Sequence, residues 1–389
     1  MFLPWGPLLE IGIRRPRDGA AWEQLFPPEA VVFTKGRFAL LAGLRLLTQA
    51  RGVRRVWLPA YLCRGVVDCV VSAGLEPRLY DVGESLEPRL DTIAPARDDA
   101  LLVVHFFGLA VPMEASLALA REHGMTLIED CAHTLPVAGS ATGPGSYGDV
   151  AIFSLRKMAP VPDGAVLVVK APLAATGVAP TGGRSRIREK LAQMALERMA
   201  FTLGWNVLAI KERLIGKRLV AGERLGGTPL VREVGDAVPR PARLVLPLLR
   251  RVDWTEIIRR RQEAYRGLVK RVARLPGVRL PVPTLPPGSV PQALPLFVDD
   301  ASSVYHGLRR VGIEVMRWPG TEQVRIEHAQ YPGTALWLTD SLCLPLGAPL
   351  SPRALDAVAG ALAGAIGQRP ARRSTTGAMR SRSQPACDR

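Results

Sequence analysis

The stretch IEDCAHTLPV, residues 128–137, ends an apolar run in side chains that could do chemistry. A carboxylate at the end of a buried run needs a cation or an N–H group as its partner. For Asp130 that partner could be the protonated ring nitrogen of a cofactor, or the free N–H groups of a following helix that Asp130 caps. His133 is either a core histidine or a contact to the same ligand. Cys131 and His133 lack the spacing of a zinc site, so we expect no metal.

A second stretch, FSLRKMAPVPDGAVLVV at 153–169, places Ser154 and Lys157 in a short loop between two apolar runs. A hydroxyl and a lysine three residues apart suit an anion or a carbonyl compound. A desolvated lysine beside Arg156 could lose its proton near neutral pH and act as a nucleophile. A solvated surface lysine is the alternative.

The surrounding sequence predicts the elements that position these side chains. Short apolar runs alternate with helical patterns from residue 30 to residue 170, which is typical of βαβ units and a largely parallel sheet covered on both faces. Ligands of such folds bind at the carboxyl ends of the strands. That rule places 59–61, 105–108 and 129–130 on one edge of the sheet. Gly36 begins a helix, and a helix N-terminus can bind phosphate.

The second half of the chain has a different pattern. A basic, partly apolar segment at 186–220 predicts a helical insertion, which packs on the protein body or a second subunit, or else contacts an anionic membrane. A long charged helix from 253, a strand at 293–300, a helix then a strand over 301–315, and a final helix capped by Ser351 predict an α+β module.

Composition limits the class of protein. The chain has 389 residues, 48% of them hydrophobic, and a net charge of +16. This charge is compatible with phosphorylated partners, but the Arg-rich 369–389 segment reads as a disordered tail, and we expect no nucleic-acid partner. Five scattered cysteines, the lack of a signal peptide pattern, and the lack of about 18 successive apolar residues predict a cytoplasmic protein.

Several strings in this order resemble the DegT/DnrJ/EryC1/StrS aminotransferases. They are GRFAL at 36–40, VWLPAYLC at 56–63, VVHFFGLAVPMEASLALAREHGMTLIEDCAH at 103–133, and GSYGDVAIFSLRK at 145–157 followed by DGAVLVV. The later GIEV and LCLPLGAPLSP also resemble family segments. The resemblance implies an α/β fold of the fold-type-I class of pyridoxal phosphate enzymes. Such a protein has a large, mostly parallel sheet domain and a smaller C-terminal α+β domain.

The resemblance also implies roles for individual residues. Lys157 would hold pyridoxal 5′-phosphate as a Schiff base and move protons between the amino donor and the cofactor. Asp130 would pair with the ring nitrogen, and His133 would lie beside the ring. Ser154 would hydrogen-bond the cofactor phosphate. Because the lysine follows the serine closely, the chain is similar to a subgroup with a compact lysine loop.

Further residues of the cofactor site follow from the same comparison. Gly36 and Arg37 stand where the family's helix N-terminus cradles the phosphate. Cys63 stands where an aromatic residue commonly stacks on the ring, so Tyr61 or Phe106 would take that place. The Asn-Tyr-Arg motif that reaches the partner subunit's phosphate in typical members has no clear counterpart here.

The resemblance implies that the protein transfers an amino group from glutamate to a nucleotide-linked keto-sugar. This reaction would belong to polysaccharide or secondary-metabolite assembly. The protein would be a homodimer. The alternative is a degenerate relative that acts as a binding or scaffold protein; retention of Asp130, Ser154 and Lys157 together argues against it. The expected organisation is an N-terminal segment at 1–29, a large domain at 30–250 with an insertion at 184–220, a small domain at 251–368, and the tail.

Overall fold

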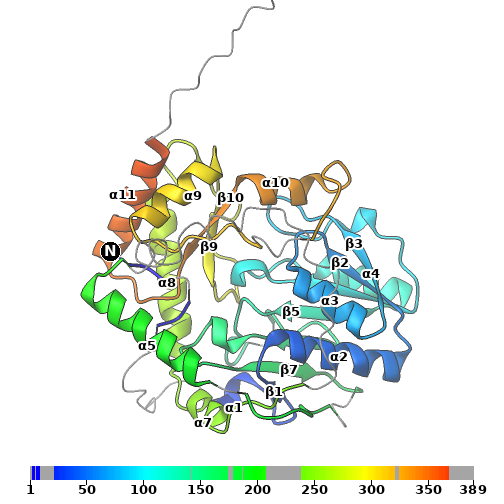
Figure 1. The fold of residues 1–389 in the computed structure, drawn as a ribbon. Coiled ribbons are helices and arrows are strands. Elements are labelled where there is room, and N and C mark those ends of the chain that lie inside the picture. Colours follow the sequence, from blue (N-terminus) through cyan, green and yellow to red (C-terminus); the bar gives the residue numbers. More distant parts are fainter. Residues whose placement is uncertain are drawn as a thin grey trace, which may run out of the picture.

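A computed structural model describes residues 2–4, 6–8, 22–140, 142–173, 178–185, 187–206, 238–319 and 324–367. The predicted tail and residues 207–220 of the predicted insertion lie outside these ranges. Two sheets organise the molecule, a large one with helices on both faces and a small antiparallel one beside it (Figure 1).

The large sheet has seven strands in the order β1-β7-β6-β5-β4-β2-β3. The strands from β6 to β3 run parallel, whereas β7 is antiparallel to both β6 and β1. Strands β4 and β5 are buried along their whole length, which explains their nearly continuous apolar sequence. The strands are β1 (Val31–Phe33), β2 (Arg55–Pro59), β3 (Glu76–Tyr80), β4 (Asp99–Val104), β5 (Thr126–Cys131), β6 (Val150–Phe153) and β7 (Ala165–Val169).

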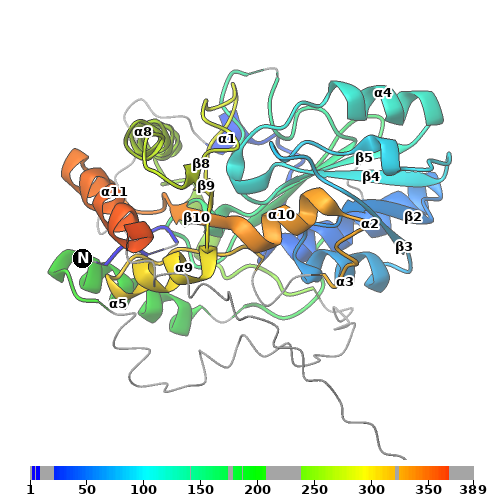
Figure 2. The same ribbon diagram turned by 90° about the horizontal axis from the view of Figure 1, so that it is seen from above.

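Helices cover both faces of this sheet. Figure 2 shows α4 (Glu114–His123) on one face and α2 (Gly36–Arg51) and α3 (Arg64–Ser72) on the other. Glycines in the left-handed conformation end α2 and α4. Short 3₁₀ turns follow the strands or join them: η1 (Leu90–Thr92), η2 (Phe106–Gly108) and η3 (Leu155–Lys157).

The small sheet has the order β10-β9-β8 and packs against α8, α9 and α10, and α11 packs on α8 and α9 (Figure 1). Asp253 caps α8 by accepting the Glu256 N–H, and the predicted cap of α11 is confirmed, because Ser351 Oγ accepts the Ala354 N–H at 3.2 Å. The elements are β8 (Val278–Arg279), β9 (Ala293–Val298), β10 (Ser341–Pro345), α8 (Trp254–Val272), α9 (Ala301–Arg310), α10 (Pro332–Asp340) and α11 (Pro352–Gly367).

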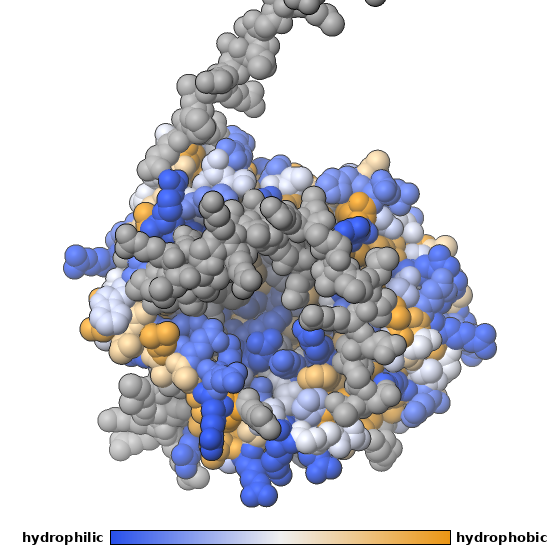
Figure 3. All heavy atoms as spheres, viewed as in Figure 1, coloured by the Kyte–Doolittle hydropathy of each residue, from blue (hydrophilic) through white to orange (hydrophobic). Residues whose placement is uncertain are grey.

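Three short or peripheral helices complete the described chain. They are α1 (Trp22–Leu25), α5 (Arg188–Leu203) and α7 (Val245–Leu249). Helix α5 exposes Leu196, Met199 and Leu203, each about half accessible. The surface in Figure 3 is otherwise mainly hydrophilic, with apolar side chains in small groups. No described helix is both long and apolar enough to cross a membrane.

The expected α/β architecture is confirmed, but some elements differ from the sequence-based prediction. Residues 312–315 were expected to form a strand and do not, because their backbone bonds go to the N-terminal segment: Leu3 N–H donates to Gly312 O, and Glu314 N–H donates to Leu3 O. Strand β1 was not predicted, because its three residues are too few to show an alternation of apolar and polar side chains. Helix α10 was also missed, because its apolar residues do not gather on one face.

Candidate active site

The register of the parallel strands brings the predicted residues to one edge of the large sheet. Asp130 pairs with Val104 of β4 on one side and with Ile152 of β6 on the other. The residues that follow these strand ends, including His105 and Ser154, therefore leave the sheet at the same level. The alternation of buried strands and helices is what places these polar groups together.

Asp130 is a buried carboxylate that favours a cationic partner. The residue is 5% exposed, and its Oδ1 accepts the Ala132 N–H at 2.9 Å. Burial raises the pKa of Asp130; the charge of Lys157, the Ala132 N–H and the charge of His105 oppose this rise without cancelling it. A further cation at this carboxylate would offset the cost of its burial. The hydrogen bond to Ala132 closes a turn, and no described helix lies between β5 and β6, so Asp130 does not cap a helix there.

His133 is neutral, and its tautomer is fixed. Burial, and then the charge of Lys157, hold the pKa of His133 well below its ordinary value of 6.5. The Phe107 N–H donates to His133 Nδ1 at 3.2 Å, so the ring proton must lie on Nε2. The Nε2–H group can therefore donate a hydrogen bond to a ligand oxygen.

Lys157 ends the 3₁₀ turn η3 and is half-buried. Its backbone N–H donates to Ser154 O at 3.0 Å, and the neighbouring Arg156 N–H donates to Gly164 O at 3.2 Å. Its positive charge acts on the pKa values of both Asp130 and His133, so the ammonium lies near both side chains. The structure thus assembles the lysine, the carboxylate and the imidazole that were predicted from separate stretches.

A cradle of polar and cationic groups lies where α2 meets the end of β6. A Cβ added at Gly36 would lie 3.6 Å from Ser154 Cβ and 3.8 Å from Ser154 Oγ, so the N-terminus of α2 lies beside this serine. Buried Thr34 Oγ1, two residues before Gly36, makes no hydrogen bond within the described part of the chain. Free N–H groups and the helix dipole favour an anion at this point.

Three cations surround this cradle. Lys35 and Arg37 flank Gly36, and Arg156 follows Ser154 by two residues. Burial lowers the pKa of Lys35, and the charges of Arg156 and Arg37 lower it further; burial and then Arg37 lower the pKa of Arg156. Asp163 opposes both shifts. Arg156 Nε is buried and has no hydrogen-bond partner among the described residues. A bound dianion would relieve this repulsion.

Tyr61 belongs to an aromatic cluster beside His133. It is fully buried, its hydroxyl donates to Trp318 O at 2.9 Å, and its ring centroid lies 4.8 Å from that of Trp318. The Trp318 ring meets His133 edge to face, with centroids 5.5 Å apart. Phe106, the other expected ring neighbour, is also buried and packs on Tyr61 and Trp318.

Sequence reasoning did not assign Lys35 or Trp318 to the site. The position of Lys35 next to Gly36 was an available signal. Trp318 is 257 residues from Tyr61 in the chain, and the sequence carried no signal that the two residues meet.

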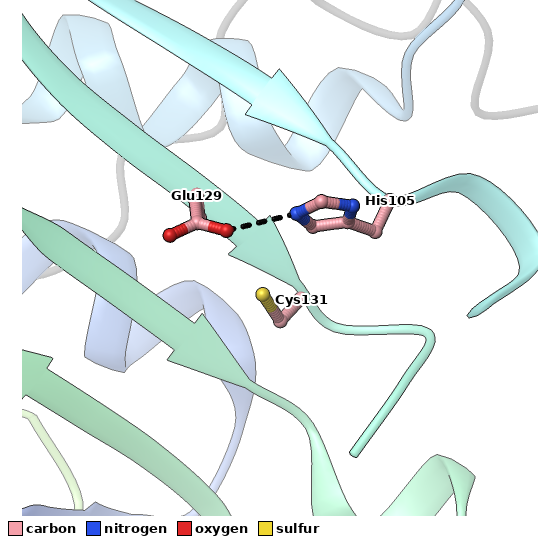
Figure 4. Close-up of side chains that lie close together, drawn as sticks. All are labelled: His105, Glu129 and Cys131. Atoms are coloured by element: carbon pink, nitrogen blue, oxygen red, sulfur yellow. Dashed lines mark hydrogen bonds and ion pairs between the residues drawn. The ribbon is translucent and has the colours of Figure 1, made fainter. Parts of the chain in front are cut away.

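His105, Glu129 and Cys131 also lie close together (Figure 4), but their bonding does not suit a metal ion. His105 Nδ1 accepts the Val111 N–H, so its Nε2–H donates to Glu129 Oε2 at 2.9 Å. Burial raises the pKa of the Cys131 thiol well above its ordinary value, which keeps it protonated. Because the histidine and the carboxylate already have partners and the thiol keeps its proton, we interpret the cluster as structural.

The residues present fit pyridoxal phosphate. A carboxylate in need of a cation lies near a lysine, and a cationic cradle in need of an anion lies at the next strand end. A ring nitrogen, a carbonyl carbon and a phosphate are the groups that these three features would hold.

Comparison with known proteins supports this assignment. Residues 25–172 match the DegT/DnrJ/EryC1/StrS aminotransferase family. A dTDP-4-dehydro-2,3,6-trideoxy-D-glucose 4-aminotransferase from Saccharopolyspora spinosa is 30% identical over 68% of this chain and 63% of its own length. A UDP-N-acetyl-3-dehydro-alpha-D-glucosamine 3-aminotransferase from Acidithiobacillus ferrooxidans is 29% identical over 34% of this chain and 38% of its own. The chain therefore spans less than two thirds of these curated relatives.

Solved structures share the fold over most of the chain. The aminotransferase TlmJ from Streptoalloteichus hindustanus superposes with a TM-score of 0.57 at 20% identity, over 87% of this chain and 86% of its own. Helicobacter pylori PseC, an aminotransferase involved in the biosynthesis of pseudoaminic acid, gives a TM-score of 0.60 at 14% identity, over 87% and 86%. At such identities the likeness establishes the fold.

Proposed function

Because residues 25–172 match the DegT/DnrJ/EryC1/StrS aminotransferase family, we propose that the protein is a pyridoxal phosphate-dependent aminotransferase. It transfers an amino group from glutamate to the carbonyl of a nucleotide-linked keto-sugar, in polysaccharide or secondary-metabolite biosynthesis. The observation that carries the proposal is the convergence of Lys157, Asp130 and His133 at one sheet edge, next to the cationic cradle at Gly36.

When bound, pyridoxal phosphate supplies a protonated pyridine ring that takes up the electron pair released at the donor's α-carbon. Asp130 keeps the proton on the ring nitrogen, since a buried carboxylate with a raised pKa gains most from a cation beside it. His133 would offer its Nε2–H to the cofactor as a hydrogen-bond donor and so help to orient the ring, because its Nδ1 is engaged by the Phe107 N–H.

Lys157 performs the proton transfers. Its Nζ would hold the cofactor when it is bound, and would act as general base and general acid at the reacting carbon of the substrate. The nearby Asp130 carboxylate and the neutral His133 ring leave Nζ as the mobile base of the site.

The phosphate is held by Ser154 and by the N-terminus of α2 at Gly36 and Arg37. We add Arg156 and Lys35 to this set, because their mutual repulsion with Arg37 is relieved by a dianion. Tyr61 does not touch the cofactor in this proposal. It is fully buried and supports Trp318, which contacts His133.

The acceptor class rests on the relatives, which are named for UDP- and dTDP-linked sugars and, in Vibrio cholerae, for GDP-perosamine. The net charge of +16 is compatible with a substrate that carries phosphates. The protein acts as a cytoplasmic homodimer. Helix α5 lies in the described part of the 186–220 segment and exposes apolar side chains. For this segment we keep peripheral membrane contact as an alternative to packing on a second subunit.

Covalent labelling tests the proposal directly. The purified protein is incubated with pyridoxal phosphate, reduced with borohydride and digested, and the labelled peptide is identified by mass spectrometry. We expect the label on Lys157, its loss in Lys157→Ala, and its retention in Lys270→Ala, an exposed lysine of α8. A separate sample of the cofactor-loaded protein that is not reduced should also convert glutamate to 2-oxoglutarate in the first half-reaction. An unlabelled wild-type protein would refute the enzyme assignment and favour the scaffold alternative.

A further inference from the structure

Arg261 of α8 is a buried charge whose partners are backbone carbonyls alone. The residue is 3% exposed. Its Nη1 donates to Pro291 O at 3.2 Å and Gln292 O at 3.5 Å, and its Nη2 donates to Met158 O at 3.0 Å and Lys157 O at 3.5 Å. None of its partners within the described ranges is a carboxylate.

Such an arrangement is costly, because burial disfavours the charged guanidinium. Burial lowers the pKa of Arg261 to about 10, which still leaves it protonated at neutral pH. A planar guanidinium offers five N–H donors in a fixed fork and can reach several carbonyls at once. A lysine ammonium has three donors at a single point, and an apolar side chain has none.

The carbonyls that Arg261 binds belong to two segments of the site. Lys157 is the last residue of a single 3₁₀ turn and Met158 follows it, so no later helical turn takes up their carbonyls. Pro291 and Gln292 precede β9, and the Gln292 N–H donates to Phe107 O at 2.7 Å.

The second segment leads directly to the imidazole. The Phe107 residue that accepts from Gln292 also donates its own N–H to His133 Nδ1. One guanidinium therefore ties the lysine turn to the backbone that orients His133.

We propose that Arg261 is a positioning residue that sets the placement of Lys157 relative to His133 by bridging the carbonyls of both segments. The proposal rests on the proposed function, because it concerns the geometry of that same site. It assigns the small domain a part in the chemistry, since α8 packs with β9 and α11 of that domain.

The test compares Arg261→Lys and Arg261→Met with Arg266→Met, an exposed arginine on the same helix. All are loaded with pyridoxal phosphate. The measurements are the pH midpoint of the visible absorbance of the lysine-bound cofactor, kcat and KM for glutamate, and the urea midpoint of unfolding. A role in stability alone would move only the urea midpoint.

We expect Arg261→Lys to fold, to shift the spectroscopic pH midpoint, and to lower kcat by about ten- to a hundredfold with little change in KM, as displacement of a positioned group does. Arg266→Met should match the wild type. An Arg261→Lys protein with the wild-type midpoint and kcat would overturn the proposal, as would failure of both Arg261 variants to fold, which would mark a purely structural residue. If the wild type itself does not take up the cofactor, the proposed function fails instead.

Discussion

Replacing Glu129 by glutamine should destabilise the protein strongly, although it changes one oxygen to a nitrogen. The Glu129 side chain is fully buried at the end of β5. Its Oε1 accepts the N–H groups of Tyr147 and Gly148 at 2.7 and 2.6 Å. Its Oε2 accepts the Gly145 N–H at 2.8 Å and the His105 Nε2–H at 2.9 Å. The carboxylate thus serves four donors and donates to none.

A glutamine amide cannot reproduce this pattern in either orientation. If its NH₂ group faces Tyr147 and Gly148, two backbone donors lose their acceptor. If it faces Gly145 and His105, the NH₂ group meets two other donors, the Gly145 N–H and the His105 Nε2–H. Moving the His105 proton to Nδ1 would leave the Val111 N–H, which now donates to that nitrogen, without an acceptor. Each buried donor left without a partner costs about 1–3 kcal/mol, so we expect a loss of about 2–6 kcal/mol in the free energy of unfolding.

Urea unfolding followed by circular dichroism measures this loss. Glu122→Gln is the matched control, because that side chain is 73% exposed on α4 and should change stability by less than about 0.5 kcal/mol. A loss below about 1 kcal/mol for Glu129→Gln would refute the reasoning, since it would mean that the donors find other acceptors.

Three further predictions follow from the same geometry. Burial raises the pKa of Glu129, but hydrogen bonds from His105 and Gly148 outweigh it and hold this pKa below its ordinary value of 4.5. The difference in unfolding free energy between wild type and Glu129→Gln should therefore be constant above that pH and shrink as the pH falls through the lowered value. Urea midpoints measured across pH will show this. Gly108→Ala should cost more than about 1–2 kcal/mol, because φ is +81° there and a Cβ would lie 2.2 Å from Val290 O; an unchanged melting temperature would contradict this. Arg156→Met should raise the Kd for pyridoxal phosphate about tenfold, measured by fluorescence titration, whereas unchanged binding would remove Arg156 from the phosphate site.

The sequence predicted the strand edges well because burial on both faces leaves a plain signal. Strands β4 and β5 read as continuous apolar runs, and the polar residues that end them, such as Asp130, are then placed by the parallel register. Contacts between distant segments carry no such signal. Arg261 lies 104 residues from Lys157 and reads in the sequence as one arginine among several on a charged helix.

The failure at 312–315 has a related cause. GIEV has the residues of a strand, but its edge is bound by residue 3, about 310 positions away, through two backbone hydrogen bonds. Local propensity indicates an extended chain there, yet it cannot say whether the partner is a sheet or a single terminal residue. The short β1 is visible only through its pairing with β7.

Taken together, the shifts in pKa narrow the kind of ligand that the site can hold. Burial raises the pKa of Asp130, which therefore gains from a cation. Burial lowers the pKa of Lys35 and Arg156, as do the neighbouring positive charges, so this side gains from an anion. A simple anion would relieve only the cationic cradle, and a simple amine only the carboxylate. A ligand with a protonated ring nitrogen and a phosphate relieves both at once. Phosphate alone should consequently bind more weakly than pyridoxal phosphate even in Lys157→Ala, where no covalent bond forms. Equal affinities of Lys157→Ala for phosphate and for pyridoxal phosphate would mean that Asp130 and the cationic cradle do not bind one ligand together, and would contradict the assignment.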